Sequence, residues 1–116
     1  MKTLKFPEYN ISARLGDFAS REVLILEVYS RMTTETLRAF IPQADAEQFA
    51  YALEVGDLYA VRIDCGPDLT VKSEITPTRG GVELYIDVPD GGEAYTFNPH
   101  QREEIAGIIR DVFRAG

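Results

Sequence analysis

Apolar and polar residues alternate along much of the chain between residues 58 and 97, the pattern of strands that bury one face. The alternation predicts four strands joined by turns rich in glycine and proline, over 58–65, 69–75, 82–88 and 94–97. In the strand over 82–88, Val82, Leu84 and Ile86 share one side. Glu83, Tyr85 and Asp87 share the other, so this strand predicts a polar face with one aromatic residue at its centre.

The first half of the chain gives a less regular pattern. Residues 22–30 (EVLILEVYS) are apolar on both sides, which predicts a central strand buried on both faces. A polar hairpin follows, and residues 36–41 return as a strand that ends at Pro42. Before them we expect strands over 3–6 and 9–15, the second ended by a turn at Gly16 and Asp17.

Two segments have apolar residues at helical spacing. The first begins at an expected N-cap, Asp45, and ends at Gly56, with the stripe Ala46, Phe49, Ala50 and Leu53. The second begins after Asn98, with Pro99 at its first position, and its stripe is Ile105, Ile108, Ile109, Val112 and Phe113. Both helices are expected to lie against a sheet.

The two helices are entered in a similar way. "FIPQADAEQFAYAL" (40–53) resembles "FNPHQREEIAGII" (97–109) once one residue is inserted at the helix entry, and "LILEV" before the first resembles "LYIDV" before the second. We interpret this as two units, 1–56 and 57–116, packed about a pseudo-two-fold axis in one domain of residues 1–116. Coincidence is the alternative, because strands that lead into covering helices share such endings. The predicted fold class is α+β, with one or two antiparallel sheets and two covering helices.

Two successive units of four strands and a helix are similar in layout to the PUR-repeat and Whirly type of single-stranded nucleic-acid binders. The resemblance extends over the order of elements and includes no sequence motif. It implies a nucleic-acid-binding module that would use Arg14, Arg21, Arg31 and Arg38 with neighbouring aromatic residues.

Charge argues against that function. The 116 residues carry a net charge of −7, and residues 45–101 alone hold three basic and eleven acidic groups. Such a surface repels phosphate backbones and attracts basic proteins, so direct nucleic-acid binding is disfavoured. No apolar run approaches the roughly 20 residues of a membrane span, and the first residues lack the apolar region of a signal peptide, so we expect a cytoplasmic protein.

Candidate catalytic residues are few. Cys65 is the only cysteine and His100 the only histidine, and the sequence gives no reason for them to meet. The phosphate-loop, GxSxG and HExxH motifs are absent, and the glycines of "TRGG" and "DGGE" lie in hairpin turns. We therefore expect no enzyme, no cofactor and no metal site, with a small enzyme around Cys65 and His100 as the weakest alternative.

An acidic hairpin is the candidate binding site. Between Arg79 and Arg102 the chain has four acidic residues and no basic one. The proposed partner-binding residues are Glu83, Tyr85, Asp87, Asp90 and Glu93. Solvated acids, and an ordinary cross-strand pair between Tyr85 and Tyr95, are the competing interpretations.

These observations predict a small acidic protein-binding module without catalytic activity. Its partner would be a basic protein surface or a nucleic-acid-binding protein complex, and a second copy of the chain is a further candidate. The sharpest version is a phage or mobile-element inhibitor, anti-defence, anti-CRISPR-like or nucleic-acid-mimicking, whose carboxylates would occupy a channel meant for DNA or RNA.

Overall fold

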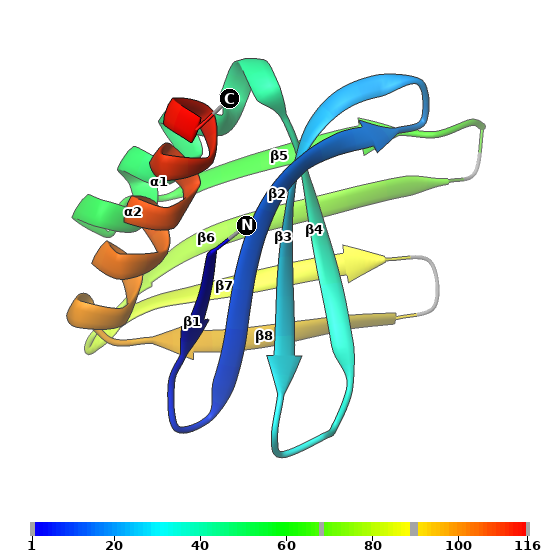
Figure 1. Ribbon diagram of the computed structural model, residues 1–116. Coiled ribbons are helices and arrows are strands. Elements are labelled where there is room, and N and C mark those ends of the chain that lie inside the picture. Colours follow the sequence, from blue (N-terminus) through cyan, green and yellow to red (C-terminus); the bar gives the residue numbers. More distant parts are fainter. Residues whose placement is uncertain (1, 68, 89–90, 116) are drawn as a thin grey trace.

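Two four-stranded antiparallel sheets and two α-helices build the fold in the computed structural model, which describes residues 2–67, 69–88 and 91–115 (Figure 1). Sheet A has the order β1 (Lys2–Lys5), β2 (Tyr9–Phe18), β3 (Arg21–Ser30) and β4 (Thr36–Pro42). Sheet B has the order β5 (Tyr59–Asp64), β6 (Thr70–Thr78), β7 (Gly81–Val88) and β8 (Gly91–Phe97). A 3₁₀ turn, η1 (Gln43–Asp45), leads into α1 (Ala46–Val55), and α2 (Pro99–Ala115) follows β8. The expected α+β class is confirmed.

The strands of sheet A cross those of sheet B, and the two helices lie side by side at one end of the molecule (Figure 1). One apolar core fills the space between both sheets and both helices, and Phe49, Leu84 and Ile105 are fully buried in it. Helix α2 contacts β1 and β2 of sheet A as well as β7 and β8 of sheet B. The two halves of the chain therefore share their core, because the second helix packs partly on the first sheet.

Both halves have the same order of elements, four strands and then a helix. Positions 56 residues apart are buried in both halves: Ile41 and Phe97, Phe49 and Ile105, Leu53 and Ile109. The sequence comparison aligns Phe40 with Phe97, but the structural equivalent of Phe97 is Ile41, one residue later. Phe40 points away from the main core. The hairpins also differ, with residues 31–35 between β3 and β4 and residues 89–90 between β7 and β8. The shared order of elements supports the pseudo-repeat only loosely, and a true structural duplication stays a prediction.

Strand β3 is buried on both faces, as its sequence predicts. Leu24 and Leu26 face the main core. Val23 and Ile25 face the other way and pack with residues from the far end of sheet B, Ile63, Val71 and the half-buried Cys65, and with Phe18 and Phe40. The rings of Phe18 and Phe40 stack with centroids 4.0 Å apart. We call this group the second cluster.

The expected turn at Gly16 and Asp17 is wrong. Strand β2 continues through both residues, and the chain turns at Ala19 and Ser20, with φ values of 53° and 62°. Gly16 lies within the strand because a Cβ there would stand 2.8 Å from Ile25 Cδ1 on the neighbouring strand. The glycine here permits close packing between neighbouring strands rather than a turn.

Two expected turns in sheet B are shorter than predicted. Strand β6 continues through Pro77, so only Arg79 and Gly80 lie between β6 and β7. Gly91 to Glu93, expected in the next turn, belong to β8. Asp68 of the expected turn at 66–68 lies outside the described residues.

The helix ends follow the sequence signals with two differences. Asp45 is the N-cap of α1, but its side chain makes no capping hydrogen bond because η1 precedes it; Gly56 ends the helix at φ 74°. At α2 the N–H of Gln101 donates to Asn98 Oδ1 (2.8 Å) and the N–H of Asn98 donates to Gln101 Oε1 (3.0 Å), a reciprocal capping box. Phe113 is 39% exposed, so the buried stripe of α2 ends before it.

Candidate partner-binding surfaces

The face of sheet B that points away from the core, here called the outer face of sheet B, carries the central part of the predicted hairpin site. Strand pairing places Ala60, Glu74, Tyr85 and Ala94 in one row across the sheet. The neighbouring rows contain Thr76, Glu83 and Thr96 on one side and Arg62, Lys72, Asp87 and Gly92 on the other. The structure thus brings Glu83, Tyr85 and Asp87 together and adds Glu74, which sequence reasoning had not included in the site.

This face is acidic, but less so than the hairpin alone. Lys72 Nζ lies 3.2 Å from Glu74 Oε2, and Lys72 is the cross-strand neighbour of Asp87. Arg62 Nε lies 3.7 Å from Asp64 Oδ1. Among its described residues, this face therefore holds two cations, Arg62 and Lys72, and four carboxylates: Asp64, Glu74, Glu83 and Asp87. Neighbouring strands supply basic residues that the hairpin sequence does not show.

Tyr85 is half-buried at the centre of the outer face of sheet B. Its ring lies over Gly92, because a Cβ at residue 92 would stand 2.3 Å from the Tyr85 hydroxyl oxygen. The expected pair with Tyr95 is wrong, since Tyr85 pairs with Ala94 and Tyr95 pairs with Leu84 on the other face. Tyr95 instead makes an edge-on contact with Tyr9, with ring centroids 5.5 Å apart.

Glu93 is separated from the other predicted site residues. It pairs with Ile86, so it lies on the core side of the sheet next to Tyr95. Burial raises the pKa of Tyr95 to about 12, and the negative charge of Glu93 adds to that shift. Asp90 lies outside the described residues. In the described part of the chain, Glu83, Tyr85 and Asp87 are the predicted site residues that share the outer face of sheet B.

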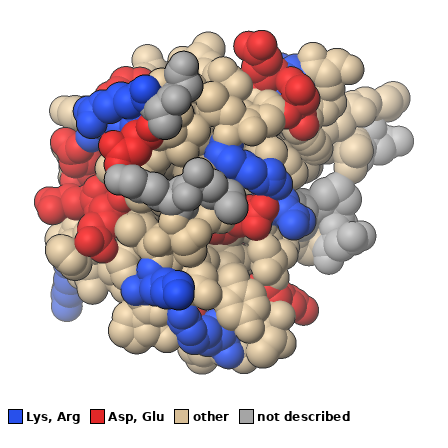
Figure 2. Space-filling view, viewed as in Figure 1, with Lys and Arg blue, Asp and Glu red and all other residues tan. Residues whose placement is uncertain are grey.

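The outer face of sheet A has the opposite charge. Arg14 Nη2 and Arg38 Nε lie 2.9 and 3.2 Å from one oxygen of Glu27, and Lys5 stands on the same face. Figure 2 shows basic side chains across the middle and lower part of this face, a group of acidic side chains at the left, and further acidic side chains at the upper and lower right. Arg31 is held by Phe6 O and Asn10 Oδ1. Of the four arginines expected to contact a nucleic acid, Arg14 and Arg38 are thus brought together by a shared carboxylate.

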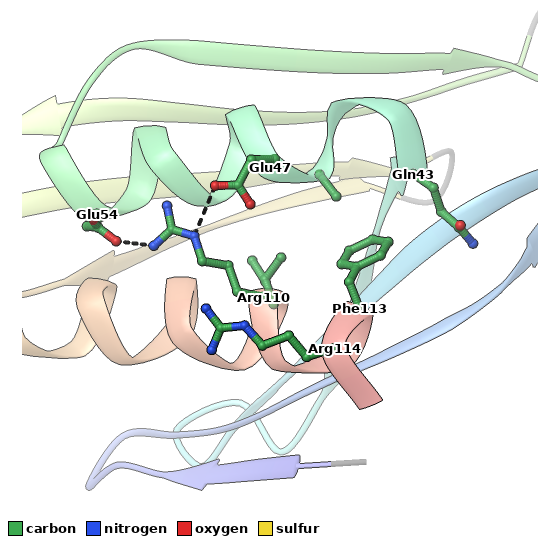
Figure 3. A pocket seen from close by; sticks show the side chains of 8 residues that line it. Gln43, Glu47, Glu54, Arg110, Phe113 and Arg114 are labelled. Atoms are coloured by element: carbon green, nitrogen blue, oxygen red, sulfur yellow. Dashed lines mark hydrogen bonds and ion pairs between the residues drawn. The ribbon is translucent and has the colours of Figure 1, made fainter. Parts of the chain in front are cut away.

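A pocket of about 600 Å³ opens between α1 and α2 (Figure 3). Arg110 spans the two helices here, with Nε 3.1 Å from Glu47 Oε1 and Nη1 hydrogen-bonded to Glu54. The hydrogen bond to Glu54 raises the pKa of Arg110 above its ordinary value, and the contact with Glu47 adds to that shift. Arg110 already forms ion pairs with both carboxylates. The cluster is therefore better suited to hold the two helices together than to bind a charged ligand.

A second pocket of about 460 Å³ lies beside α1. Its apolar lining includes Tyr51 and Leu58, which are 56% and 64% exposed. Glu47 and Asp57 are also part of its wall. Two other lining residues are hydrogen-bonded to each other, because the Tyr59 hydroxyl donates to Gln48 Oε1 at 3.1 Å.

Cys65 and His100 stand apart. Cys65 follows β5 and packs in the second cluster, whereas His100 is exposed on the first turn of α2, with Nε2 3.7 Å from Glu104 Oε1. The end of β5 and the start of α2 lie on opposite sides of the molecule (Figure 1). Within the described ranges, no group of three or more His, Cys, Asp and Glu residues could hold a metal ion. In the same ranges, no helix is both long and apolar enough to cross a membrane.

A scan against protein-family models finds no match for this chain, and searches of the curated proteins and of the solved structures find none either. The similarity in layout to PUR-repeat and Whirly proteins gains no support from these comparisons. Function must therefore be argued from the surfaces of the protein.

Proposed function

We propose that the protein is a binding module that holds a basic protein segment on the outer face of sheet B. One observation carries this proposal: Tyr85 lies half-buried in the middle of that face, next to Glu74 on β6 and between Glu83 and Asp87 on its own strand. A partly desolvated aromatic residue surrounded by charged groups is a typical anchor of protein interfaces. The carboxylates supply charge complementarity to lysine and arginine side chains.

Arginine fits this surface better than lysine. A guanidinium group can stack on an aromatic ring while its N–H groups donate to a carboxylate, and Tyr85 offers both a ring and acidic neighbours. The space above Gly92 is filled by the ring, whereas the small, exposed Ala94 beside it leaves space for a partner. Because the ring packs over Gly92, part of its side-chain freedom is already lost before binding. A nucleic-acid-handling complex, the partner class that charge and size suggest, would present such arginines in its basic channel.

The experiment that tests the proposal is a titration with a short oligoarginine peptide at low ionic strength, followed by amide NMR. We expect saturable shifts centred on Glu74, Glu83, Tyr85 and Asp87. The matched control is a pair of reversals on α2, Glu103→Lys and Glu104→Lys, which changes the net charge as much as Glu83→Lys with Asp87→Lys. Shifts that follow net charge alone and ignore position would contradict the proposal.

A single-stranded oligonucleotide is titrated in parallel. The case for nucleic-acid binding by sheet A rests on Arg14 and Arg38. These two arginines share the single carboxylate of Glu27, so the group keeps a net positive charge. Tight, salt-sensitive binding with shifts centred on these two arginines would put the nucleic-acid function first. On the present proposal the strand causes weak, scattered shifts.

A further inference from the structure

A third pocket, of about 290 Å³, lies where the end of α1, the β6–β7 turn and the start of α2 meet. Val55 and Gly56 come from α1, Arg79 and Gly80 from the turn, and Arg102 from α2. The wall contains two arginines and no carboxylate, although the chain carries a net charge of −7. The other two pockets described above both include Glu47 and a second acidic residue.

In the described part of the chain, both arginines of this pocket are unpaired. Among the described residues, neither Arg79 nor Arg102 makes a side-chain hydrogen bond or an ion pair. Arg14, Arg38 and Arg110, in contrast, each lie against a carboxylate. Two cations that line one pocket, with no carboxylate in its wall, favour the binding of an anion there.

Arg102 gives the stronger indication. Its Nε is buried and has no hydrogen-bond acceptor in the described part of the chain. A buried N–H that has left water without finding an acceptor costs roughly 1–3 kcal/mol. Its Nη1 occupies the space that a side chain at residue 56 would fill, since a Cβ atom there would stand 2.2 Å away, so the guanidinium lies against the C-terminal end of α1.

The N-terminus of α2 adds a favourable electrostatic field at the pocket but few hydrogen-bond donors. Pro99 has no N–H, and the N–H of Gln101 is taken by Asn98. The positive end of this 17-residue helix still attracts negative charge. The two guanidinium groups must therefore supply most of the hydrogen bonds to a ligand.

We propose that this pocket binds a small oxyanion, the phosphate or carboxylate group of a ligand, held by Arg79 and Arg102. Guanidinium groups bind both kinds of oxyanion with paired, charge-assisted hydrogen bonds. The volume is at the lower limit of ordinary ligand pockets, so it suits a head group rather than a whole nucleotide. This site is independent of the outer face of sheet B.

Titration of the protein with inorganic phosphate tests the proposal, followed by NMR of the Arg102 Nε–H and of the Gly80 and Gly81 amides. We expect saturable shifts at these three positions. Arg102→Gln should weaken phosphate binding about tenfold or more, and Arg102→Lys should weaken it less, because lysine keeps the charge but not the paired donors. Arg62→Gln, the same change on the outer face of sheet B, should leave the affinity within about twofold.

A parallel titration with sodium acetate separates the two ligand sources. Tighter binding of phosphate identifies a phosphoryl ligand, and tighter binding of acetate identifies a carboxylate ligand. If neither anion causes saturable shifts, or if Arg62→Gln weakens phosphate binding as much as Arg102→Gln, the site does not exist.

Two further variants decide the matter if Arg102→Gln does not fold. Arg79 is exposed, so Arg79→Gln should fold and still weaken phosphate binding. A Cβ at Gly80 meets no atom within 4 Å, so Gly80→Glu can place a carboxylate at the pocket, where it should compete with phosphate. Unchanged phosphate affinity in both folded variants would overturn the proposal.

Discussion

The ring of Tyr85 lies over Gly92 on the neighbouring strand: a Cβ atom at residue 92 would stand 2.3 Å from the Tyr85 hydroxyl oxygen and 2.6 Å from Cζ. Residue 92 pairs with Asp87, two positions from Tyr85, so the contact runs diagonally across β7 and β8. The missing side chain at residue 92 thus determines where the aromatic ring sits on the outer face of sheet B.

Replacing Gly92 by alanine should push the Tyr85 ring away from β8. The expected loss of stability is only about 1 kcal/mol, because the new methyl group meets the free end of a side chain that can turn aside. The Tyr85 ring resonances should shift, and oligoarginine binding should weaken, as we also expect for Tyr85→Ala. Gly80→Ala, which adds a methyl group in open space, is the control. Unmoved ring resonances in Gly92→Ala would show that the contact does not position the ring.

Replacing Ile109 by alanine should destabilise the fold by about 2–4 kcal/mol, because the side chain is 1% exposed and its loss leaves a cavity in the shared core. Phe113→Ala, four residues further along α2 at a 39% exposed position, should cost clearly less. Denaturant unfolding measures both. Equal losses would mean that Phe113 is covered by a second chain in solution.

Stability should fall with alkaline pH, and Tyr95 should account for part of the fall. Burial raises its pKa from 10.0 to about 12 in the folded protein. The unfolded chain releases this proton first, so the stabilisation is complete below pH 10 and is lost as pH rises towards 12. Burial also raises the pKa of Tyr9 and Tyr59, which act in the same direction. Unfolding free energies of the wild type and Tyr95→Phe over this range measure the effect, and identical slopes would contradict it.

Changing Cys65 and His100 together to alanine should leave oligoarginine binding unchanged. Cys65 is half-buried in the second cluster and His100 is exposed, so the double change should cost no more than about 1–2 kcal/mol. Calorimetric titration of the variant, with circular dichroism as a check on folding, tests this. If a folded double variant retained oligoarginine binding but lost the biological activity of the protein in its host, the enzyme hypothesis around Cys65 and His100 would be favoured instead.

Much of the fold could be predicted because the local signals agree with the packing. Val82, Leu84 and Ile86 alternate with polar residues and are buried, and Asn98 caps α2 as expected. Glycine misled the prediction at Gly16, since a glycine that admits a neighbouring side chain looks like one that permits a turn. The contact of α2 with sheet A could not be predicted, because no local pattern specifies which sheet a helix covers.

Only part of the candidate site could be predicted, because the alternation along one strand does not show which residues of other strands lie beside it. Alternation along one strand correctly placed Glu83, Tyr85 and Asp87 on one face. It could not place Glu93, because β8 begins at Gly91 and its pairing puts Glu93 opposite Ile86. Glu74 and Lys72 join the face only through the pairing of β6 with β7, and cross-strand neighbours are not readable from either strand alone.

The most direct test of the proposed function is the association rate of an oligoarginine peptide with Glu83→Lys combined with Asp87→Lys, compared with the wild type and with Glu103→Lys combined with Glu104→Lys. If the outer face of sheet B binds basic segments, the first variant should associate about tenfold more slowly at low ionic strength, and the difference should shrink as salt is added. The control should remain close to the wild type. Equal rates for the two double variants, with both correctly folded, would contradict the assignment of binding to this face.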